Sequence, residues 1–201
     1  MQIDPASETS RRIYYLMTSG VVPRPIAWVS TVSRDGVLNL APFSYFNAIT
    51  SKPPLLSISV GRRRGERKDT SANASATGEL VINVVTEKNL LPMVETAGEY
   101  GPEVNEFEVA GLTPIPSERV KPPRVKEAPV QLECRTHQII EISPGIADLV
   151  IAEVLLFHVA DDLPVDENLR IPSSELKPVG RLAGDQYTTL GELRDAARPK
   201  V

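Results

Sequence analysis

Short apolar runs and alternating apolar and polar positions recur along the chain, and most of these segments are rich in β-branched residues. This pattern is typical of β-strands. It predicts strands at about residues 26–32, 37–47, 55–60, 80–86, 130–142 and 148–161. Asp35-Gly36 separates the first two segments, and Ser143-Pro144-Gly145 separates the last two. Both are turn signals, so the chain should contain antiparallel hairpins.

Helical periodicity is confined to short segments. It predicts helices at about 8–17, at 71–77 between an Asp69 or Thr70 cap and Gly78, at 87–97, and near 190–197. Strands outnumber helices, which favours a barrel or sandwich. Strand–helix alternation, G-x-G-x-x-G and the Walker sequence are all missing, so neither a Rossmann domain nor a phosphate-binding Walker loop is expected.

Composition narrows the class of protein. The chain has 201 residues, 41% hydrophobic and 24% charged, which is typical of one globular domain. Cys134 is the only cysteine, and His137 and His158 are the only histidines, so we expect neither an internal disulfide nor a metal centre. No apolar run approaches membrane-spanning length and the N-terminus lacks signal-peptide features, so we expect a cytoplasmic protein without membrane contact.

The charge is unevenly distributed. The net charge of −4 argues against nucleic-acid binding, yet five of the 22 Lys and Arg residues fall within residues 62–68. A predicted helix begins directly after them. Helix N-termini expose unpaired N–H groups, and neighbouring cations can complete a phosphate site there. A solvated charged loop would explain the same residues, and both interpretations stay open.

A second candidate is the segment 39–47, which mixes small, aromatic and amide residues around Pro42. Because proline cannot donate to a strand ladder, the interrupted pairing could leave polar edges for a planar ligand. An irregular edge strand that buries its aromatic residues is the alternative. His137, His158 and Cys134 fit structural roles, and no nucleophile motif is present. Redox or transfer chemistry would therefore come from a cofactor, with no catalytic side chain and no metal.

Several separated motifs occur in one order between about residues 10 and 161. They are residues 24–31 (RPIAWVST), Asp35-Gly36, residues 39–44 (NLAPFS), Pro53-Pro54 and Lys68-Asp69-Thr70. In this order the sequence resembles the flavin reductase-like, FMN-binding split-barrel family, and within it the flavoredoxin-like branch. An ordered set of motifs is more specific than any single one of them.

The resemblance implies a mainly β fold: a six-stranded antiparallel split β-barrel of Greek-key type with a few short peripheral helices. It implies one FMN-binding domain over residues 1–201, with a core at about 10–161 and a C-terminal extension at 162–201. A homodimer with FMN near the subunit interface is also implied. The cofactor-binding residues would be Trp28, Val29, Ser30, Thr31, Asn39, Ala41, Pro42, Phe43, Ser44, Ser59, Val60, Gly61, Arg62, Lys68, Asp69 and Thr70.

The activity implied by the resemblance is NAD(P)H-dependent reduction of FMN, including supply of reduced flavin to a monooxygenase. A non-catalytic, flavoredoxin-type electron carrier is the alternative. A barrel that binds a different phosphorylated ligand is a third hypothesis, which the ordered motifs disfavour. No motif distinguishes NADH from NADPH as electron donor, and none identifies the redox partner.

Overall fold

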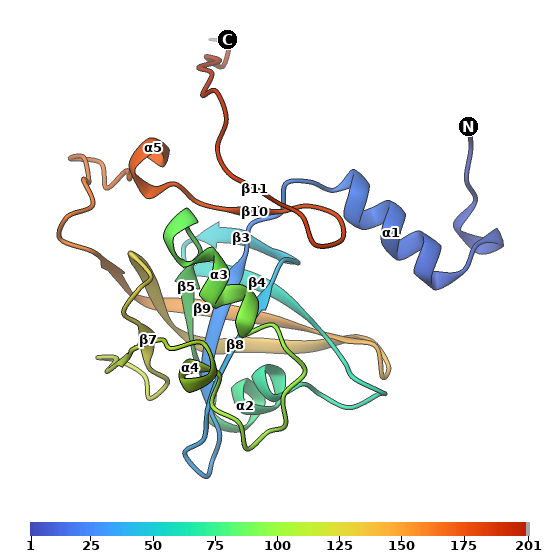
Figure 1. The fold of residues 1–201 in the computed structure, drawn as a ribbon, viewed down its shortest axis with the longest axis horizontal. Helices are drawn as coiled ribbons and strands as arrows, with labels where there is room; N and C mark the ends of the chain where they lie inside the picture. Colours follow the sequence, from blue (N-terminus) through green and yellow to red (C-terminus); the bar gives the residue numbers. More distant parts are fainter. Residues whose placement is uncertain (200–201) are drawn as a thin grey trace.

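The computed structural model describes residues 1–199, and its centre is an antiparallel sheet of seven strands (Figure 1). These strands are β1 Ala27–Val32, β2 Leu38–Phe43, β3 Phe46–Ser51, β4 Pro54–Gly61, β5 Glu79–Val84, β8 Val130–Ser143 and β9 Ala147–Val159. Two short hairpins pair β6 Pro114–Ile115 with β7 Arg124–Val125, and β10 Gly180–Arg181 with β11 Tyr187–Thr188. The helices are α1 Ser10–Gly20, α2 Asp69–Thr77, α3 Leu90–Glu95, α4 Glu106–Val109 and α5 Ser173–Leu176, with 3-10 turns at Pro5–Ser7 and Glu87–Asn89.

The sheet closes on itself through its two edge strands. Its strand order is β2-β1-β5-β8-β9-β4-β3, and only Ser44 and Tyr45 separate β2 from β3 in the sequence. The Ser59 N–H donates to the Tyr45 carbonyl at 2.8 Å across this junction. β2 and β3 are therefore two halves of one bent strand, which pairs first with β1 and then with β4. The predicted mainly β split barrel is confirmed, with the second predicted strand, at 37–47, divided into β2 and β3.

Pro42 does not break the strand. It lies in β2 opposite Trp28. In antiparallel pairing, alternate residues point their N–H away from the partner strand, so a proline fits at such a position without losing a ladder bond. The break falls instead at Ser44-Tyr45, where the bent strand passes from one partner to the other. The prediction of one continuous strand at 37–47 was therefore wrong, because the strand is interrupted at Ser44-Tyr45 and continues to Ser51.

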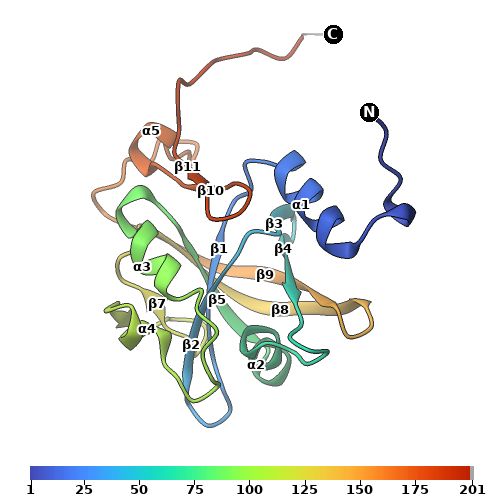
Figure 2. The ribbon, with the colours of Figure 1, turned by 45° about the vertical axis from the view of Figure 1, so that its right-hand side comes forward.

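Alternating side chains divide the core into two clusters. Val29 points into the barrel with residues of β5 and β9, whereas the neighbouring Trp28 packs outside the barrel with Met93 and Phe107. The indole N–H of Trp28 donates to the Thr96 hydroxyl at 2.9 Å. This second cluster fixes α3 and α4 beside β1 and β2 (Figure 2). It thereby holds the segment between these two helices over the free edge of β2.

The proline-rich segment 113–129 is anchored by one buried carboxylate. Glu133 on β8 is fully buried and accepts the backbone N–H groups of Glu118 at 2.9 Å and Arg119 at 2.6 Å. His158 lies 2.6 Å away through Nε2. Burial opposes ionisation of Glu133, but these hydrogen bonds outweigh it and lower the pKa of the carboxyl. His158 therefore has the structural role that the sequence suggested.

Arg24 joins the end of α1 to the segment that follows β10. Its guanidinium donates to the Thr18 and Val21 carbonyls at 2.8 Å and to the Leu182 carbonyl at 2.9 Å. Residues 189–199 form no helix and extend away from the barrel (Figure 1), so the predicted helix at 190–197 was wrong. An isolated helix of that length is marginal in water, and residues 190–197 are exposed, without the packing against the barrel that would be needed to stabilise one. No helix within residues 1–199 is long and apolar enough to cross a membrane.

Candidate functional site

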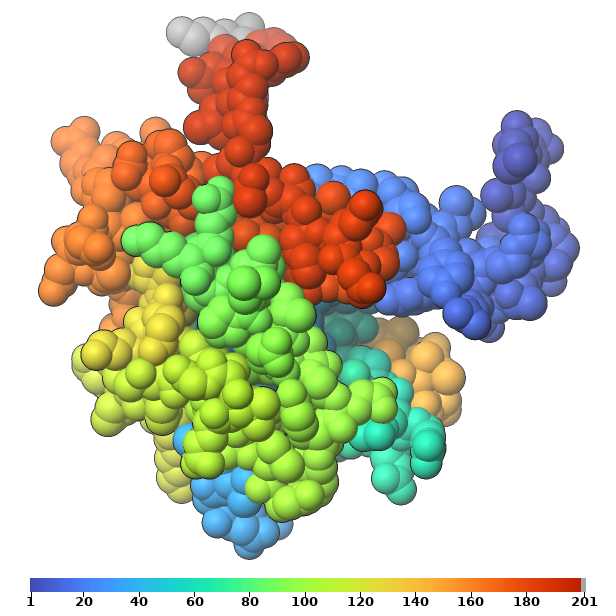
Figure 3. All heavy atoms as spheres, in the orientation of Figure 1, coloured from blue at the N-terminus to red at the C-terminus, as the bar shows by residue number. Residues whose placement is uncertain are grey.

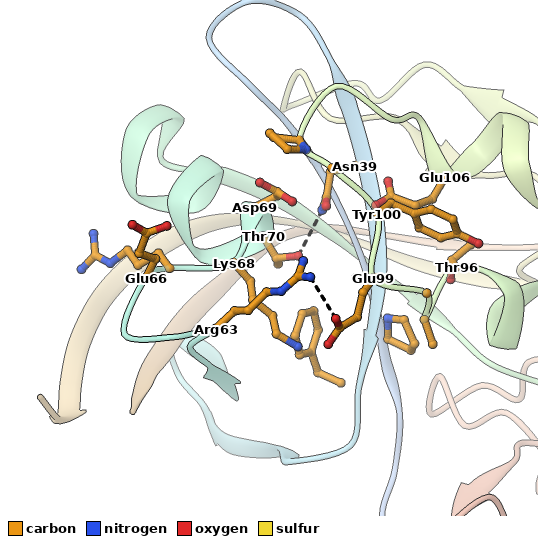
Figure 4. Close-up of a pocket in the computed structure, with 18 of the residues that line it drawn as sticks. Asn39, Arg63, Glu66, Lys68, Asp69, Thr70, Thr96, Glu99, Tyr100 and Glu106 are labelled. Carbon is orange, nitrogen blue, oxygen red and sulfur yellow. Dashed lines mark hydrogen bonds and ion pairs between the residues drawn. The ribbon is translucent and has the colours of Figure 1, made fainter. Parts of the chain in front are cut away.

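A cavity of about 590 Å³ lies between the free edge of β2, the start of α2 and the segment that connects α3 to α4 (Figure 4). This volume falls within the ~300–1,000 Å³ typical of small-ligand pockets. The cavity brings together the following predicted residues: Asn39, Ala41, Pro42, Phe43, Lys68, Asp69 and Thr70. These residues come from two motifs about thirty positions apart, and the barrel joins them at one edge.

The remaining predicted residues do not line the cavity. They are Trp28, Val29, Ser30, Thr31, Ser44, Ser59, Val60, Gly61 and Arg62. The four residues of β1 are fully buried and pair with β2. Ser30, for example, donates its hydroxyl to the Pro123 carbonyl. These β1 side chains support the strand that borders the cavity, and direct contact of the whole group with a cofactor stays a prediction.

A buried amide joins the two motifs that border the cavity. Asn39 on β2 donates through Nδ2 to the hydroxyls of Thr31 and Thr70, both at 3.0 Å. Thr31 also accepts the Asn73 amide at 3.1 Å. The hydrogen bonds fix the first turn of α2 against the edge of β2. They also engage the Thr70 side chain, which the sequence suggested as a helix cap.

The N-terminus of α2 is open toward the cavity. Its N-cap is Lys68, which makes no side-chain cap hydrogen bond, so the predicted cap at Asp69 or Thr70 was wrong. Gly78 ends the helix in the left-handed conformation (φ 76°), as predicted. A helix start without a side-chain cap leaves backbone N–H groups and the positive end of the helix dipole available. Together with the Lys68 ammonium, this end of the cavity suits a phosphate group.

Two of the five clustered cations serve the structure of the loop. Arg62 donates to Asp148 at 2.8 and 3.3 Å, and Arg67 donates to the same carboxylate at 3.2 Å. The Asp148 side chain is 0% exposed. The hydrogen bonds from Arg62 hold the pKa of Asp148 below its ordinary value, although burial acts in the opposite direction. Arg62 thus fixes the loop to β9 and lies outside the cavity lining.

The other three cations of the loop do not bind Asp148, and they line the cavity together with Arg67. Arg63 and Glu66 exchange backbone hydrogen bonds at 2.9 Å around Arg64 and Gly65, which both have positive φ. This tight hairpin carries Arg63 to the opposite wall, where its guanidinium meets Glu99 at 2.9 Å (Figure 4). Within residues 1–199, the side chains of Arg64 and Lys68 make no hydrogen bond or ion pair. Lys68 and Arg64 are therefore the cations of the loop available to a ligand, whereas Arg63 is paired with Glu99.

The opposite wall was missed by the sequence analysis. It consists of residues 96–102 together with Glu106. Tyr100 lies against Gly98, where an added Cβ would come within 2.6 Å of its ring, and donates its hydroxyl to the Glu95 carbonyl at 3.0 Å. Gly98, Gly101 and Pro102 signal only a loop. Nothing in their spacing indicates that the loop faces β2, because this follows from the packing of α3 and α4.

Glu106 places a carboxyl in this wall, and the residue is only 6% exposed. Its Oε2 accepts the Leu40 N–H at 3.0 Å. Because Pro42 has no N–H and Leu40 is engaged by Glu106, this part of the β2 edge offers a ligand backbone carbonyls only. Burial raises the pKa of Glu106, which the Leu40 hydrogen bond partly opposes. No group of three or more potential metal ligands occurs within residues 1–199.

Comparison with known proteins identifies the family. The flavin reductase like domain model matches residues 17–171. Nitrilotriacetate monooxygenase component B from Bacillus cereus is 43% identical with a TM-score of 0.94, covering 98% of both chains. The 2-nitrobenzoate 2-nitroreductase of Pseudomonas fluorescens is 31% identical with a TM-score of 0.91, covering 99% of this chain and 96% of its own. Flavoredoxin of Desulfovibrio vulgaris has a TM-score of 0.75 at 21% identity, covering 98% and 97%, and shows the shared fold alone.

Proposed function

Because the chain belongs to the flavin reductase like family, we propose that it binds FMN in the cavity beside β2 and reduces it with NADH or NADPH. The observation that carries this proposal is that one cavity contains both a site suited to a phosphate and a free strand edge. One is a phosphate-suited end formed by Lys68 and the start of α2, and the other is the free edge of β2. We also propose that the protein is located in the cytoplasm, as predicted from the sequence.

The described residues fit FMN in chemistry as well as in size. Lys68, Arg64 and the N–H groups of the first α2 turn would hold the phosphate. The β2 edge would accept a hydrogen bond from a ring N–H through its free carbonyls, since no backbone donor competes there. Ala41 and Pro42 supply small apolar surface beside this edge. A phosphate at one end and a planar ring along a strand edge therefore agree with the arrangement.

When bound, FMN supplies the redox chemistry, accepting hydride from a nicotinamide donor and passing electrons to an acceptor. The residues of this chain bind and orient. Asn39 keeps the phosphate end at a fixed place relative to β2, and the Asp148 ion pairs keep the basic loop in position. None of these residues needs to exchange a proton during turnover, which agrees with the scarcity of histidine and cysteine near the cavity.

The physiological role proposed is supply of reduced flavin to a monooxygenase. The 43% identity to a protein named as a monooxygenase component supports it. Direct reduction of a nitro compound is a second candidate, supported by the 31% identity to a nitroreductase. Electron transfer without nicotinamide-dependent catalysis, as in a flavoredoxin-type carrier, is the alternative to both.

Anaerobic mixing of the FMN-loaded protein with NADH or NADPH in a stopped-flow spectrometer tests the reductase proposal. We expect rapid loss of the visible flavin absorbance with at least one nucleotide, followed by multiple turnovers when free FMN is added. Bleaching by dithionite alone would identify a carrier and contradict the reductase. Adding a nitroaromatic compound to the reduced protein distinguishes the second candidate, which requires prompt reoxidation without oxygen.

We also propose a homodimer, because α1 presents a group of exposed aromatic and apolar side chains. Tyr14, Tyr15, Leu16 and Met17 are each about half exposed, and Thr18 is the only buried residue of the helix. Figure 3 shows the N-terminal segment standing out from the body of the molecule. A helix of 11 residues is marginal alone in water, so burial against a second copy would stabilise it.

Light scattering during size-exclusion chromatography tests the dimer. We expect a mass near twice the 22.0 kDa of one chain. Leu16→Glu should shift the mass toward the monomer, because a charge would be buried in the interface. Leu193→Glu is the matched control, since Leu193 is similarly exposed but lies in the C-terminal tail. A monomeric wild-type protein at micromolar concentration, or a Leu16→Glu variant that stays dimeric, would contradict this assignment.

A further inference from the structure

The carboxyl of Glu106 has one oxygen that the protein does not use. Oε2 accepts the Leu40 N–H, and no hydrogen bond within residues 1–199 reaches Oε1. No buried side-chain oxygen or nitrogen of the described chain lacks a hydrogen-bond partner. Oε1 is therefore not sealed inside the protein, and Glu106 belongs to the lining of the cavity. Because the residue is only 6% exposed, the surface that remains open is the part that meets the cavity.

Keeping a carboxyl at this place is costly unless it has a partner. Burial of an ionised group without compensating hydrogen bonds is strongly unfavourable, and the donors that reach this carboxyl are neutral backbone N–H groups, mainly that of Leu40. The surrounding core would accept an apolar residue, since Leu40 and Phe107 beside Glu106 are fully buried. A buried carboxyl whose Oε1 is open at a cavity wall points to a ligand that donates a hydrogen bond to it.

The location of Glu106 indicates which part of a bound flavin it meets. The phosphate end is marked by Lys68 and the start of α2, and Asn39 bridges from Thr70 to β2. Glu106 contacts Leu40, the next residue along β2 from Asn39 and before Pro42. It therefore lies beside the portion of the ligand that leads from the phosphate toward the ring. In FMN this portion carries the ribityl hydroxyls, and the ring beyond it carries an N–H.

We propose that Glu106 is a flavin-positioning residue whose free carboxylate oxygen accepts a hydrogen bond from a hydroxyl or N–H donor of the bound flavin. This inference rests on the proposed function, and it adds a ligand contact that no motif of the sequence indicated. The hydrogen bond would favour the ionised carboxylate, so flavin binding and loss of the Glu106 proton would be coupled.

Other charged groups also face the cavity and must be separated from Glu106 in any pH experiment. They are Arg63, Arg64, Glu66, Arg67 and Lys68 from the basic loop, Asp69 from α2, and Glu99 and Tyr100 from the opposite wall. The phosphate of FMN itself titrates with a second pKa of about 6. A comparison between wild type and a Glu106 variant at each pH cancels these contributions, because both proteins share them.

Glu106→Gln tests the proposal, since the amide oxygen can still accept the Leu40 N–H while the charge is removed. We expect the affinity lost in the variant to grow with pH, to about fivefold or more near pH 8 and to less near pH 5, because hydrogen bonds to charged groups are stronger than neutral ones. Glu108→Gln, on the same short helix but outside the cavity lining, should bind like wild type throughout. The proposal is overturned if the ratio of the FMN dissociation constant of Glu106→Gln to that of wild type does not change with pH, or if this ratio falls below one.

Two further flavins identify the donor. Riboflavin keeps the ribityl hydroxyls but has no phosphate, and lumiflavin keeps only the ring. A pH-dependent loss seen with FMN and riboflavin but absent with lumiflavin assigns the contact to a hydroxyl, whereas a loss seen with all three assigns it to the ring N–H. Wild-type protein that binds none of the three flavins overturns the proposed function itself. Wild type and variant that bind all three equally overturn only the role of Glu106.

Calorimetry of wild-type protein gives a test that does not depend on the variant folding. Riboflavin binding near pH 5 is measured in two buffers that differ in ionisation enthalpy. The difference in heat reports the protons exchanged on binding. We expect net release of protons to the buffer, because the bound flavin favours ionised Glu106. Uptake of protons, or no exchange from pH 5 to pH 8, would overturn the proposal.

Discussion

Lys68→Glu should lower the affinity for FMN by about 100-fold, or about 2.7 kcal/mol, because a charge-assisted contact is replaced by repulsion of the phosphate. Lys68 lies at the N-cap of α2, is exposed and has no partner in residues 1–199. Its loss should therefore leave the fold intact. Titration of the apoprotein with FMN, followed by flavin fluorescence, gives the two dissociation constants.

Riboflavin and a distant lysine provide the controls for this result. Riboflavin lacks the phosphate, so its affinity should be nearly the same in wild type and Lys68→Glu. Lys88→Glu makes the same change of charge at an exposed residue outside the cavity and should bind FMN normally. Equal FMN affinity in Lys68→Glu and wild type would remove Lys68 from the site. An equal loss for riboflavin would show that the variant acts on the ring position instead.

Asp148→Asn should destabilise the protein by about 3 kcal/mol, the lower end of the range for breaking a buried ion pair. The lower end applies because Arg62 retains Glu141 at 2.9 Å. A loss of this size should lower the melting temperature of a chain of this length by about 6–12 °C. The two arginines would lose the carboxylate that fixes the basic loop, so FMN affinity should fall as well. Thermal unfolding and FMN titration measure the two effects separately.

The same variant predicts a pH dependence with a definite sign. The pKa of Asp148 is lower in the folded protein, so its stabilisation is fully present above the ordinary aspartate value of about 3.9 and is lost as the pH falls through the folded value. The stability difference between wild type and Asp148→Asn should therefore shrink in acid below about pH 4. Asp161→Asn, at an exposed site, should match wild type. A constant difference across this range would show that the charge of Asp148 is not responsible.

The main strands and the two hairpins that join neighbouring strands could be predicted from the sequence, because both depend on the local pattern of residues. Asp35-Gly36 forms the first hairpin turn, with Gly36 at φ 87°, and the last two long strands pair as predicted. The seven predicted residues that line the cavity also lie within two motifs quoted from the sequence. Local turn chemistry and β-branched runs carried this information.

The rest of the site depends on contacts between distant segments. Asp148 follows Arg62 by 86 positions, and nothing in either neighbourhood indicates that they meet. Glu106 reaches Leu40 across 66 positions because Met93 and Phe107 pack beside Trp28. The excess of arginine in residues 62–68 is explained because these cations have two different roles. Arg62 and Arg67 bind Asp148 and hold the loop, and all of the cluster except Arg62 lines the cavity.

The absorbance spectrum of the purified protein, before and after addition of reduced nicotinamide nucleotide, tests the central claim most directly. The account predicts one FMN per chain, bound as isolated or after titration, with a visible spectrum that bleaches on addition of NADH or NADPH under anaerobic conditions. A colourless protein whose spectrum and stability are unchanged by excess FMN would contradict it.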